Sequence, residues 1–393
     1  MDFSEPESWA RLRCEAEEFV AAHVTREVIE HERRTGDGVD RALTRKLGKR
    51  GWIAAGWPAA EGGAALDPFE TAALWDALRK GGVPTIGPGT TMLPANAIRV
   101  TGSAELKARI LPGVAAGETL ICLGYTEPAG GSDVFACATR SQRDGDEWIV
   151  NGQKIFTTFA HLADYCFLLT RSQPGSAGPR GLTMLLVPLD SPGIEIQAVH
   201  TVGHERTNIV FYNDVRVADA NRVGDAHEGF AVMRAALEAE QNVAPASRTG
   251  LVAKDALEFA RTHRGADGAD LIDDVLVRER LARMTMEAEV ADLLGLRAAF
   301  LDAEGNKPGP SRRCSGRRVT CGHRQRRSTL RAPRACSTGP IRRARWTAAW
   351  TRITAAPLLR RFTADPVRCC AASSWRIGSD FRAAVPAVNS HET

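Results

Sequence analysis

The chain has 393 residues, a length typical of two or three packed domains. Its opening segment, Met1 to Phe19, is acidic and amphipathic, which predicts a helix rather than a secretory leader. No apolar run is long enough to span a bilayer. The nine cysteines are scattered apart from one adjacent pair, so no disulfide framework is indicated and a reducing cytoplasm fits best.

The net charge of +4 is an average over two unlike parts of the chain. Residues 306–393 contain 18 arginines, one lysine and three acidic residues, which gives this segment a charge of +16. Residues 1–305 contain 32 basic and 44 acidic residues, a charge of −12. So sharp a difference predicts a boundary after Gly305.

Residues 1–118 are predicted to form an N-terminal helical domain. Apolar residues recur at helical spacing in Trp9–His31 and in Val39–Gly51, and Gly/Pro-rich stretches such as Trp57 to Gly63 separate the helices.

Residues 119–225 are predicted to form an antiparallel β domain, because short apolar runs there alternate with turn residues. The runs are Glu147–Val150, Tyr165–Thr170, Leu182–Val187 and Ile209–Phe211. The dipeptide Asn151-Gly152 predicts a two-residue hairpin turn.

Residues 226–305 return to a helical pattern, with predicted helices over Phe230–His263 and Leu271–Glu304 and a kink at Pro245. Two helices are fewer than a four-helix bundle needs, so the C-terminal bundle is expected to be incomplete. The predicted fold class is therefore α+β, with an N-terminal helical domain, a central antiparallel β domain and a C-terminal helical bundle.

Residues 306–393 form an arginine-rich tail with no sustained period, and we expect it to be unstructured. One hypothesis is a reading-frame change between Pro308 and Ser311, and the alternative is a genuine disordered basic tail. The tail lacks a stacking platform or a reading helix, so nucleic-acid binding ranks last. Its cysteines form no Cys-x2–4-Cys pair, so no metal site is predicted.

The segment from Cys122 to Asp133 carries the strongest pattern for ligand binding. Thr126 and Ser132 provide hydroxyl donors, and Gly130 and Gly131 allow backbone amides to approach an anionic cofactor. Taken alone, the same residues also suit an ordinary turn.

A second segment, Trp148 to Thr158, ends in Phe156, Thr157 and Thr158. An aromatic ring beside two hydroxyls could cover a planar ring system and bond to its edge, although a core phenylalanine with two β-formers is the alternative. The histidines are dispersed, so no histidine–carboxylate pair is predicted and each is assigned to a surface or turn (His161, His200, His204 and His227).

Together these motifs resemble the acyl-CoA dehydrogenase family. The residues that carry the resemblance are Thr126-Glu-Pro-Ala-Gly-Gly-Ser-Asp133, Asn151-Gly-Gln-Lys-Ile-Phe-Thr-Thr158, Val215-Arg-Val217 and Gly224 leading to Gly229-Phe230. Trp57-Pro58, Leu111-Pro112 and Gly117-Glu118 agree with it, so the resemblance covers about residues 1–305.

The resemblance implies an FAD cofactor. Tyr125 and Thr126 would touch the flavin pyrimidine edge, and Ser132 with the amide of Gly131 would face the pyrophosphate, with Ser132 also near the substrate thioester. Phe156, Thr157 and Thr158 would flank the isoalloxazine ring.

The implied reaction is α,β-dehydrogenation of an acyl-CoA in lipid or steroid side-chain β-oxidation, with a carboxylate removing the α proton and hydride passing to flavin N5. Counting from Gly229-Phe230, that base is Glu240, which continues the apolar stripe of Met233 and Leu237. Solvated glutamates remain the alternative. Gln241 stands where many relatives have a substrate-contacting arginine.

The resemblance also implies partners. Many relatives carry an Arg-x-x-Phe-Gly sequence that reaches a neighbouring subunit's FAD, but here the chain reads His263 to Gly268 without that pair. Similar chains of bacterial steroid degradation form heterotetramers, so we expect a second acyl-CoA dehydrogenase subunit, with an electron-transfer flavoprotein or similar acceptor. The alternatives are a non-catalytic partner subunit and an acyl-CoA oxidase.

Overall fold

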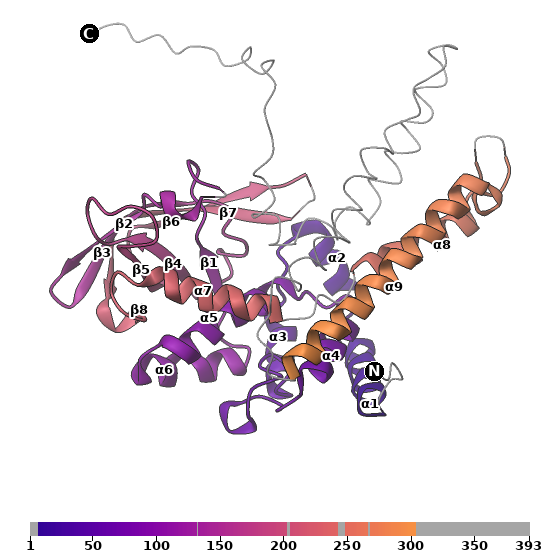
Figure 1. The fold of residues 1–393 in the computed structure, drawn as a ribbon, viewed down its shortest axis with the longest axis horizontal. Coiled ribbons are helices and arrows are strands. Elements are labelled where there is room, and N and C mark those ends of the chain that lie inside the picture. The colour runs from indigo at the N-terminus through magenta and orange to yellow at the C-terminus, as the bar shows by residue number, and fades with distance from the viewer. Residues whose placement is uncertain (1–6, 132, 203–204, 243–247, 266–267, 304–393) are drawn as a thin grey trace, which may run out of the picture.

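The computed structural model describes residues 7–303, except 132, 203–204, 243–247 and 266–267. Within this part, helices precede and follow a central β-sheet, which confirms the predicted α+β order (Figure 1). None of the helices described is both long and apolar enough to cross a membrane. The tail over residues 306–393, for which disorder is predicted, lies outside the described residues.

The N-terminal layer is helical, as predicted. Its elements are α1 (Glu7–His23), α2 (Arg26–Thr35), α3 (Arg41–Lys49), η1 (Ala59–Glu61), α4 (Pro68–Lys80), α5 (Ile86–Thr101) and α6 (Ala104–Ala115). The segment Trp9–His31, predicted as one helix, forms parts of two helices. The side chain of Thr25 accepts a hydrogen bond from the amide of Val28 and caps the start of α2. Phe19, Leu47 and Leu74 join α1, α3 and α4 in one core.

The central domain is a single sheet. Its strands are β1 (Ile121–Gly124), β2 (Arg140–Asp144), β3 (Glu147–Lys154), β4 (Tyr165–Arg171), β5 (Leu182–Pro188), β6 (Ile194–His200), β7 (Arg206–Ala218) and β8 (Arg222–Val223). The order is β6-β7-β3-β2-β4-β5-β8, with β1 beside β4. Most neighbours are antiparallel, as predicted, but β4 is parallel to β1 and to β2, so the sheet is mixed.

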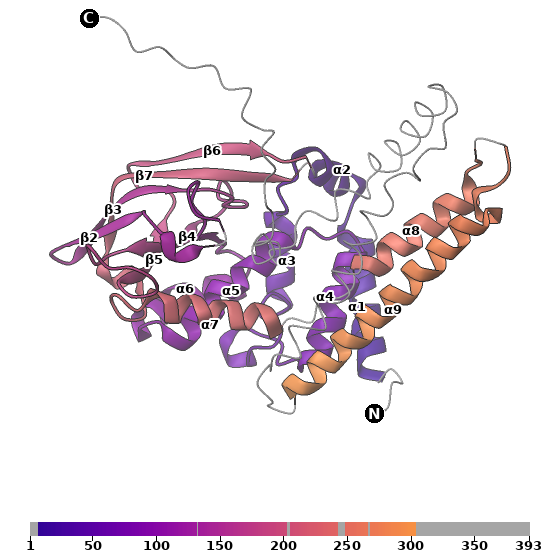
Figure 2. The ribbon, with the colours of Figure 1, turned by 45° about the horizontal axis from the view of Figure 1, so that its top comes forward.

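Alternate residues of β4 face two different cores. Phe167 and Leu169 pack with α5, α6 and α7 (Gly229–Asn242), which lie along one face of the sheet in Figures 1 and 2. Cys166 and Leu168 face the opposite way and pack with residues of β3 and β7, including Tyr212. This period of two is what a strand buried on both faces requires.

The hairpin predicted at Asn151-Gly152 is wrong. Both residues lie inside β3, where the register against β7 shifts between Val150 and Gly152, and the turn between β2 and β3 falls at Gly145 instead. Gly152 has a φ of 146°, and a Cβ there would lie 2.7 Å from Thr139 Cα. Glycine is therefore required by a β-bulge rather than by a turn.

The C-terminal part comprises α7, α8 (Arg248–Thr262), η4 (Leu271–Asp273) and α9 (Val275–Ala303). The helix predicted over Phe230–His263 is thus two helices, and Pro245 lies outside the described residues. Both views show α8 and α9 as a pair that projects away from the sheet (Figure 2), while α9 also contacts α4 and α7.

Candidate functional site

The loop that follows β1 is a compact turn. The amide of Glu127 donates to Gly130 O and the amide of Gly130 donates to Glu127 O, over 3.4 and 3.1 Å. Tyr125, at the start of the loop, is half-buried and packs its ring 6.3 Å from that of Phe167. The short 3₁₀ turn η2 (Val134–Ala136) ends the loop. The loop backbone is therefore fixed on both sides of Gly131.

A buried ion pair ties this loop to β3. Lys154 Nζ lies 2.7 Å from Glu127 Oε1, and the lysine is fully buried. The carboxylate also accepts hydrogen bonds from the amides of Ala138 and Thr139, at 2.7 and 2.9 Å, and from the Cys137 thiol at 3.3 Å. Burial alone would raise the pKa of Glu127, but the charge of Lys154 and the amide hydrogen bonds lower it to about 2. The pair therefore stays ionised at neutral pH.

The chain beyond β3 takes an unusual turn at Phe156. This residue has a φ of 59°, in the left-handed region, and its side chain is 58% exposed. Thr157 is fully buried, and its Oγ1 has no hydrogen-bond partner among the residues that the structure describes. Thr158 is half-buried, with Oγ1 3.5 Å from that of Thr207. An exposed ring thus stands beside an unpaired hydroxyl.

The two motifs meet through the backbone. The amide of Ile155 donates to Thr126 O over 2.8 Å, so the start of the loop lies directly beside the end of β3. An added Cβ on Gly131 would meet no atom within 4 Å, so packing within the chain does not require glycine there. The loop and the strand end therefore lie side by side, and their predicted roles in ligand binding stay predictions.

The remaining predicted site residues are less completely described. Glu240 and Gln241 belong to the last turn of α7, but their side chains lie outside the described residues, as does Ser132. The preceding stripe of α7 faces the core as predicted, because Met233 is buried and Leu237 packs against the same cluster. The predicted roles of Glu240, Gln241 and Ser132 stay predictions.

Sequence reasoning missed a histidine–carboxylate pair, and the expectation that none exists is wrong. His161 Nε2 lies 2.9 Å from Oδ1 of Asp37, which is 124 positions away in the chain. Burial lowers the pKa of His161, as does the charge of Arg206, while Asp37 opposes both. His227 also has a specific contact, since its Nδ1 lies 2.8 Å from Ser172 Oγ.

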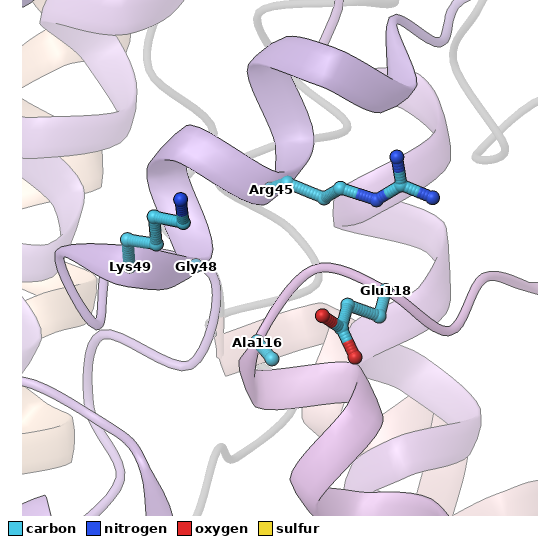
Figure 3. Close-up of a pocket in the computed structure, with 5 residues that line it drawn as sticks. All are labelled: Arg45, Gly48, Lys49, Ala116 and Glu118. Atoms are coloured by element: carbon cyan, nitrogen blue, oxygen red, sulfur yellow. The ribbon is translucent and has the colours of Figure 1, made fainter.

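Two hollows are found on the surface of the described residues. One, of about 390 Å³, lies between α3 and the end of α6, and Figure 3 shows Arg45, Lys49 and Glu118 around it. None of the predicted site residues lines it. The other, of about 330 Å³, lies at the start of α7 between Arg180, Arg234 and Phe230. The ring of Phe230 meets that of Phe135, just beyond the loop, at 5.1 Å.

The described residues form an α+β protein in which the loop after β1 and the end of β3 lie side by side in the central domain. The chain matches three successive models of acyl-CoA dehydrogenases: the N-terminal domain over residues 6–118, the middle domain over 122–215 and the C-terminal domain over 227–355. It therefore belongs to the acyl-CoA dehydrogenase family. The last match extends beyond Gly305 into the arginine-rich segment.

Individual relatives agree with this assignment. The chain is 35% identical to acyl-CoA dehydrogenase FadE26 of Mycobacterium tuberculosis, over 70% of this chain and 69% of that protein. It is 34% identical to acyl-CoA dehydrogenase IpdE1 of the same organism, over 62% and 63% of the two chains. Among solved structures, the ChsE4-ChsE5 complex from M. tuberculosis is 30% identical with a TM-score of 0.68, covering 79% of this chain and 80% of the other.

Proposed function

We propose that the chain is an FAD-dependent acyl-CoA dehydrogenase that acts on a lipid or steroid side-chain thioester together with a second subunit of the same family. The observation that carries this proposal is the 2.8 Å hydrogen bond from Ile155 N to Thr126 O, which joins the two motifs into one site. The family normally uses FAD, and the relatives named above are acyl-CoA dehydrogenases.

The residues of the site fit a flavin. A buried hydroxyl without a partner is costly, so Thr157 Oγ1, which has none among the described residues, supports a ligand at the strand end. The exposed ring of Phe156 offers an apolar face to a planar ring, and Thr126 lies beside the same strand end through its hydrogen bond from Ile155 N. Gly131 has open space where a Cβ would lie, which suits the approach of a pyrophosphate to its backbone amide, with Ser132 as the second predicted contact.

The chemistry is divided between the cofactor and the chain. FAD, when bound, supplies the acceptor for the hydride that leaves the β carbon. Glu240, in the last turn of α7 and three positions after Leu237, removes the α proton. Deprotonation of so weak an acid requires hydrogen bonds to the thioester carbonyl and exclusion of water. The buried residues that precede Glu240 on α7, Met233 and Ala236, support the second requirement.

The hollow at the start of α7 suits the coenzyme A end of the substrate. Arg180 and Arg234 line it, and guanidinium groups are effective phosphate ligands. Phe230, between them, packs against Phe135 at the end of the flavin-side loop. We therefore assign this hollow to the phosphates of coenzyme A, with the acyl chain directed toward Glu240 and Gln241.

Two features support a partner subunit. The turn between α8 and α9 carries Arg264, which pairs with Asp270, and lies at the far end of a helix pair that projects away from the sheet (Figure 1). In its sequence, this turn lacks the arginine–phenylalanine pair with which many relatives reach a neighbouring subunit's FAD, so another subunit would have to complete the site. Apolar residues are also exposed along α9, namely Val275, Leu276, Met286, Val290 and Leu293. An electron-transfer flavoprotein or similar acceptor in the cytoplasm would complete the reaction.

Anaerobic reduction of the flavin by acyl-CoA tests the proposal. The full chain, loaded with added FAD, should lose flavin absorbance when mixed with acyl-CoA thioesters, including steroid side-chain thioesters. Glu240→Gln should slow this step about 10²–10⁴-fold, because general-base catalysis contributes about that much. Glu238→Gln on the same helix is the matched control and should be close to wild type.

The outcome also separates the alternatives. If FAD binds but no acyl-CoA bleaches it, with or without a co-expressed subunit, the chain is the non-catalytic partner, a reading that Gln241 in place of the family's arginine favours. Rapid reoxidation by O2 would instead indicate an oxidase. Equal rates for Glu240→Gln and wild type would contradict the assignment of the base.

A further inference from the structure

A continuous chain of hydrogen bonds connects the N-terminal helical domain to the strand end that precedes Thr158. It begins at Asp37, a buried carboxylate in the loop between α2 and α3. Asp37 Oδ1 lies 2.9 Å from His161 Nε2, and His161 Nδ1 lies 3.4 Å from Asn208 Nδ2. Asn208, fully buried on β7, is the last member of the chain.

Asn208 holds the peptide of Thr157 from both sides. Its side-chain Nδ2 donates to Thr157 O over 2.9 Å, and its backbone carbonyl accepts the amide of Thr157 over 3.0 Å. Arg206 Nε donates to the remaining atom, Asn208 Oδ1, over 3.3 Å. Both backbone groups of Thr157 are therefore occupied, and its hydroxyl is the group left for a ligand.

The network fixes the tautomer of His161. Asn208 Nδ2 can only donate, so His161 Nδ1 accepts and the ring hydrogen lies on Nε2, from which it is donated to Asp37. A neutral imidazole meets this requirement, and burial favours the neutral form. The charged groups that face the ring are Asp37 from the α2–α3 loop and Arg206 from β7, with His31 of α2 3.8 Å from Asp37.

The segment next to this network needs such support. A non-glycine residue in the left-handed region, as Phe156 is, persists only where neighbouring contacts hold it. The α2–α3 loop is itself fixed, because Arg206 N donates to Gly36 O over 3.1 Å, and α2 lies beside the ends of β6 and β7 in both views (Figures 1 and 2).

We infer that Asp37, His161 and Asn208 are positioning residues, through which the N-terminal domain holds Phe156, Thr157 and Thr158 in the shape that receives the flavin. None of the three is among the residues assigned to the flavin. They act through the peptide group of Thr157. This inference rests on the proposed function, since it concerns the same site.

Hydrogen exchange in the full chain without flavin tests the first half of the inference. Asn208→Asp removes the donor to Thr157 O with little change in volume, so the Thr157 amide should exchange at least about tenfold faster. Asp37→Ala, in a different domain, should have the same effect by releasing His161. Asn221→Asp, at another buried asparagine of this domain, is the matched control and should leave exchange at Thr157 unchanged.

Flavin binding tests the second half. Asn208→Asp and Asp37→Ala should each weaken FAD binding about tenfold and alter the flavin absorbance envelope, whereas His161→Gln, which can still bridge Asp37 and Asn208, should stay within about threefold of wild type. Faster exchange without weaker binding, or unchanged exchange in Asn208→Asp, would overturn the inference. Failure of the wild-type chain to bind FAD would instead contradict the proposed function.

Discussion

The pairing of Glu127 with Lys154 is the residue-level contact on which the shape of the site depends. It connects the loop and strand motifs across 27 positions of sequence, inside a part of the protein that water does not reach. A buried charge without a partner raises the free energy of the folded state, so either residue alone would destabilise the fold. The loop is therefore fixed by an ion pair of residues other than those assigned to the flavin.

Lys154→Met should lower the free energy of unfolding by about 3–5 kcal/mol, because it leaves the Glu127 carboxylate buried and unpaired. Replacing both residues, as Lys154→Met with Glu127→Met, should recover part of this loss. Urea denaturation of the single and double variants measures the coupling. Additive effects of the two substitutions would contradict the account.

The same pair predicts a pH dependence. The pKa of Glu127 is lowered from 4.5 to about 2 in the folded chain, so its stabilisation is fully present above about pH 4.5 and is lost as the pH falls toward 2. Wild type should therefore lose stability over that window more steeply than Lys154→Met does.

Sequence alone predicted the loop and strand-end residues as the site, but not the residues that hold these segments in place. Thr126 and Phe156 stand in local motifs that can be read from neighbours in the chain. Lys154 reads as an exposed charge, since lysine is rarely buried. Asp37 and His161 are distant in sequence, and only the docking of the α2–α3 loop onto the end of β3 brings them together.

At the scale of elements, the bulge in β3 directs the strand end toward the loop. Gly152→Ala should cost about 3 kcal/mol, because the new Cβ combines an unfavourable φ with contact to Thr139. Gly145→Ala, in the β2–β3 turn at a φ of 60° with open space around it, should cost only about 1 kcal/mol. Thermal denaturation compares the two, and equal losses would argue against the bulge as a required feature.

Strands with a clear apolar run were predictable, whereas the short or mainly exposed strands were not. β3, β4, β5 and β7 were found from their apolar runs, although β7 is much longer than predicted. The strand β2 was missed because Ser141 is its only buried residue, so its sequence resembles that of a polar loop. Asn151-Gly152 misled because a bulge and a hairpin turn need the same permissive backbone.

At the scale of the whole molecule, the exposed apolar face of α9 predicts association. Met286→Glu combined with Val290→Glu should weaken subunit association at least about tenfold without lowering thermal stability, because both side chains are exposed in the single chain. Glu289→Gln on the same helix is the control. Subunit association is measured by sedimentation of the full chain, alone and co-expressed with a second acyl-CoA dehydrogenase subunit. Unchanged assembly in the double variant would rule out this face.

The order of domains was predictable from composition and periodicity, since helix, sheet and helix differ in spacing of apolar residues. The way the parts pack was not, because contacts such as that of α9 with α4 join distant segments. The family match to residue 355 covers part of the segment that the charge asymmetry separates from the rest, and the boundary at Gly305 stays a prediction.

A structure of the full chain with bound FAD tests the central claim most directly. The account predicts the isoalloxazine ring against Phe156, with its pyrimidine edge at Thr126 and the Thr157 or Thr158 hydroxyl within hydrogen-bonding distance. It also predicts the carboxylate of residue 240 on the opposite side of the substrate cavity. A flavin bound elsewhere, with the Thr157 hydroxyl still unpaired, would contradict it.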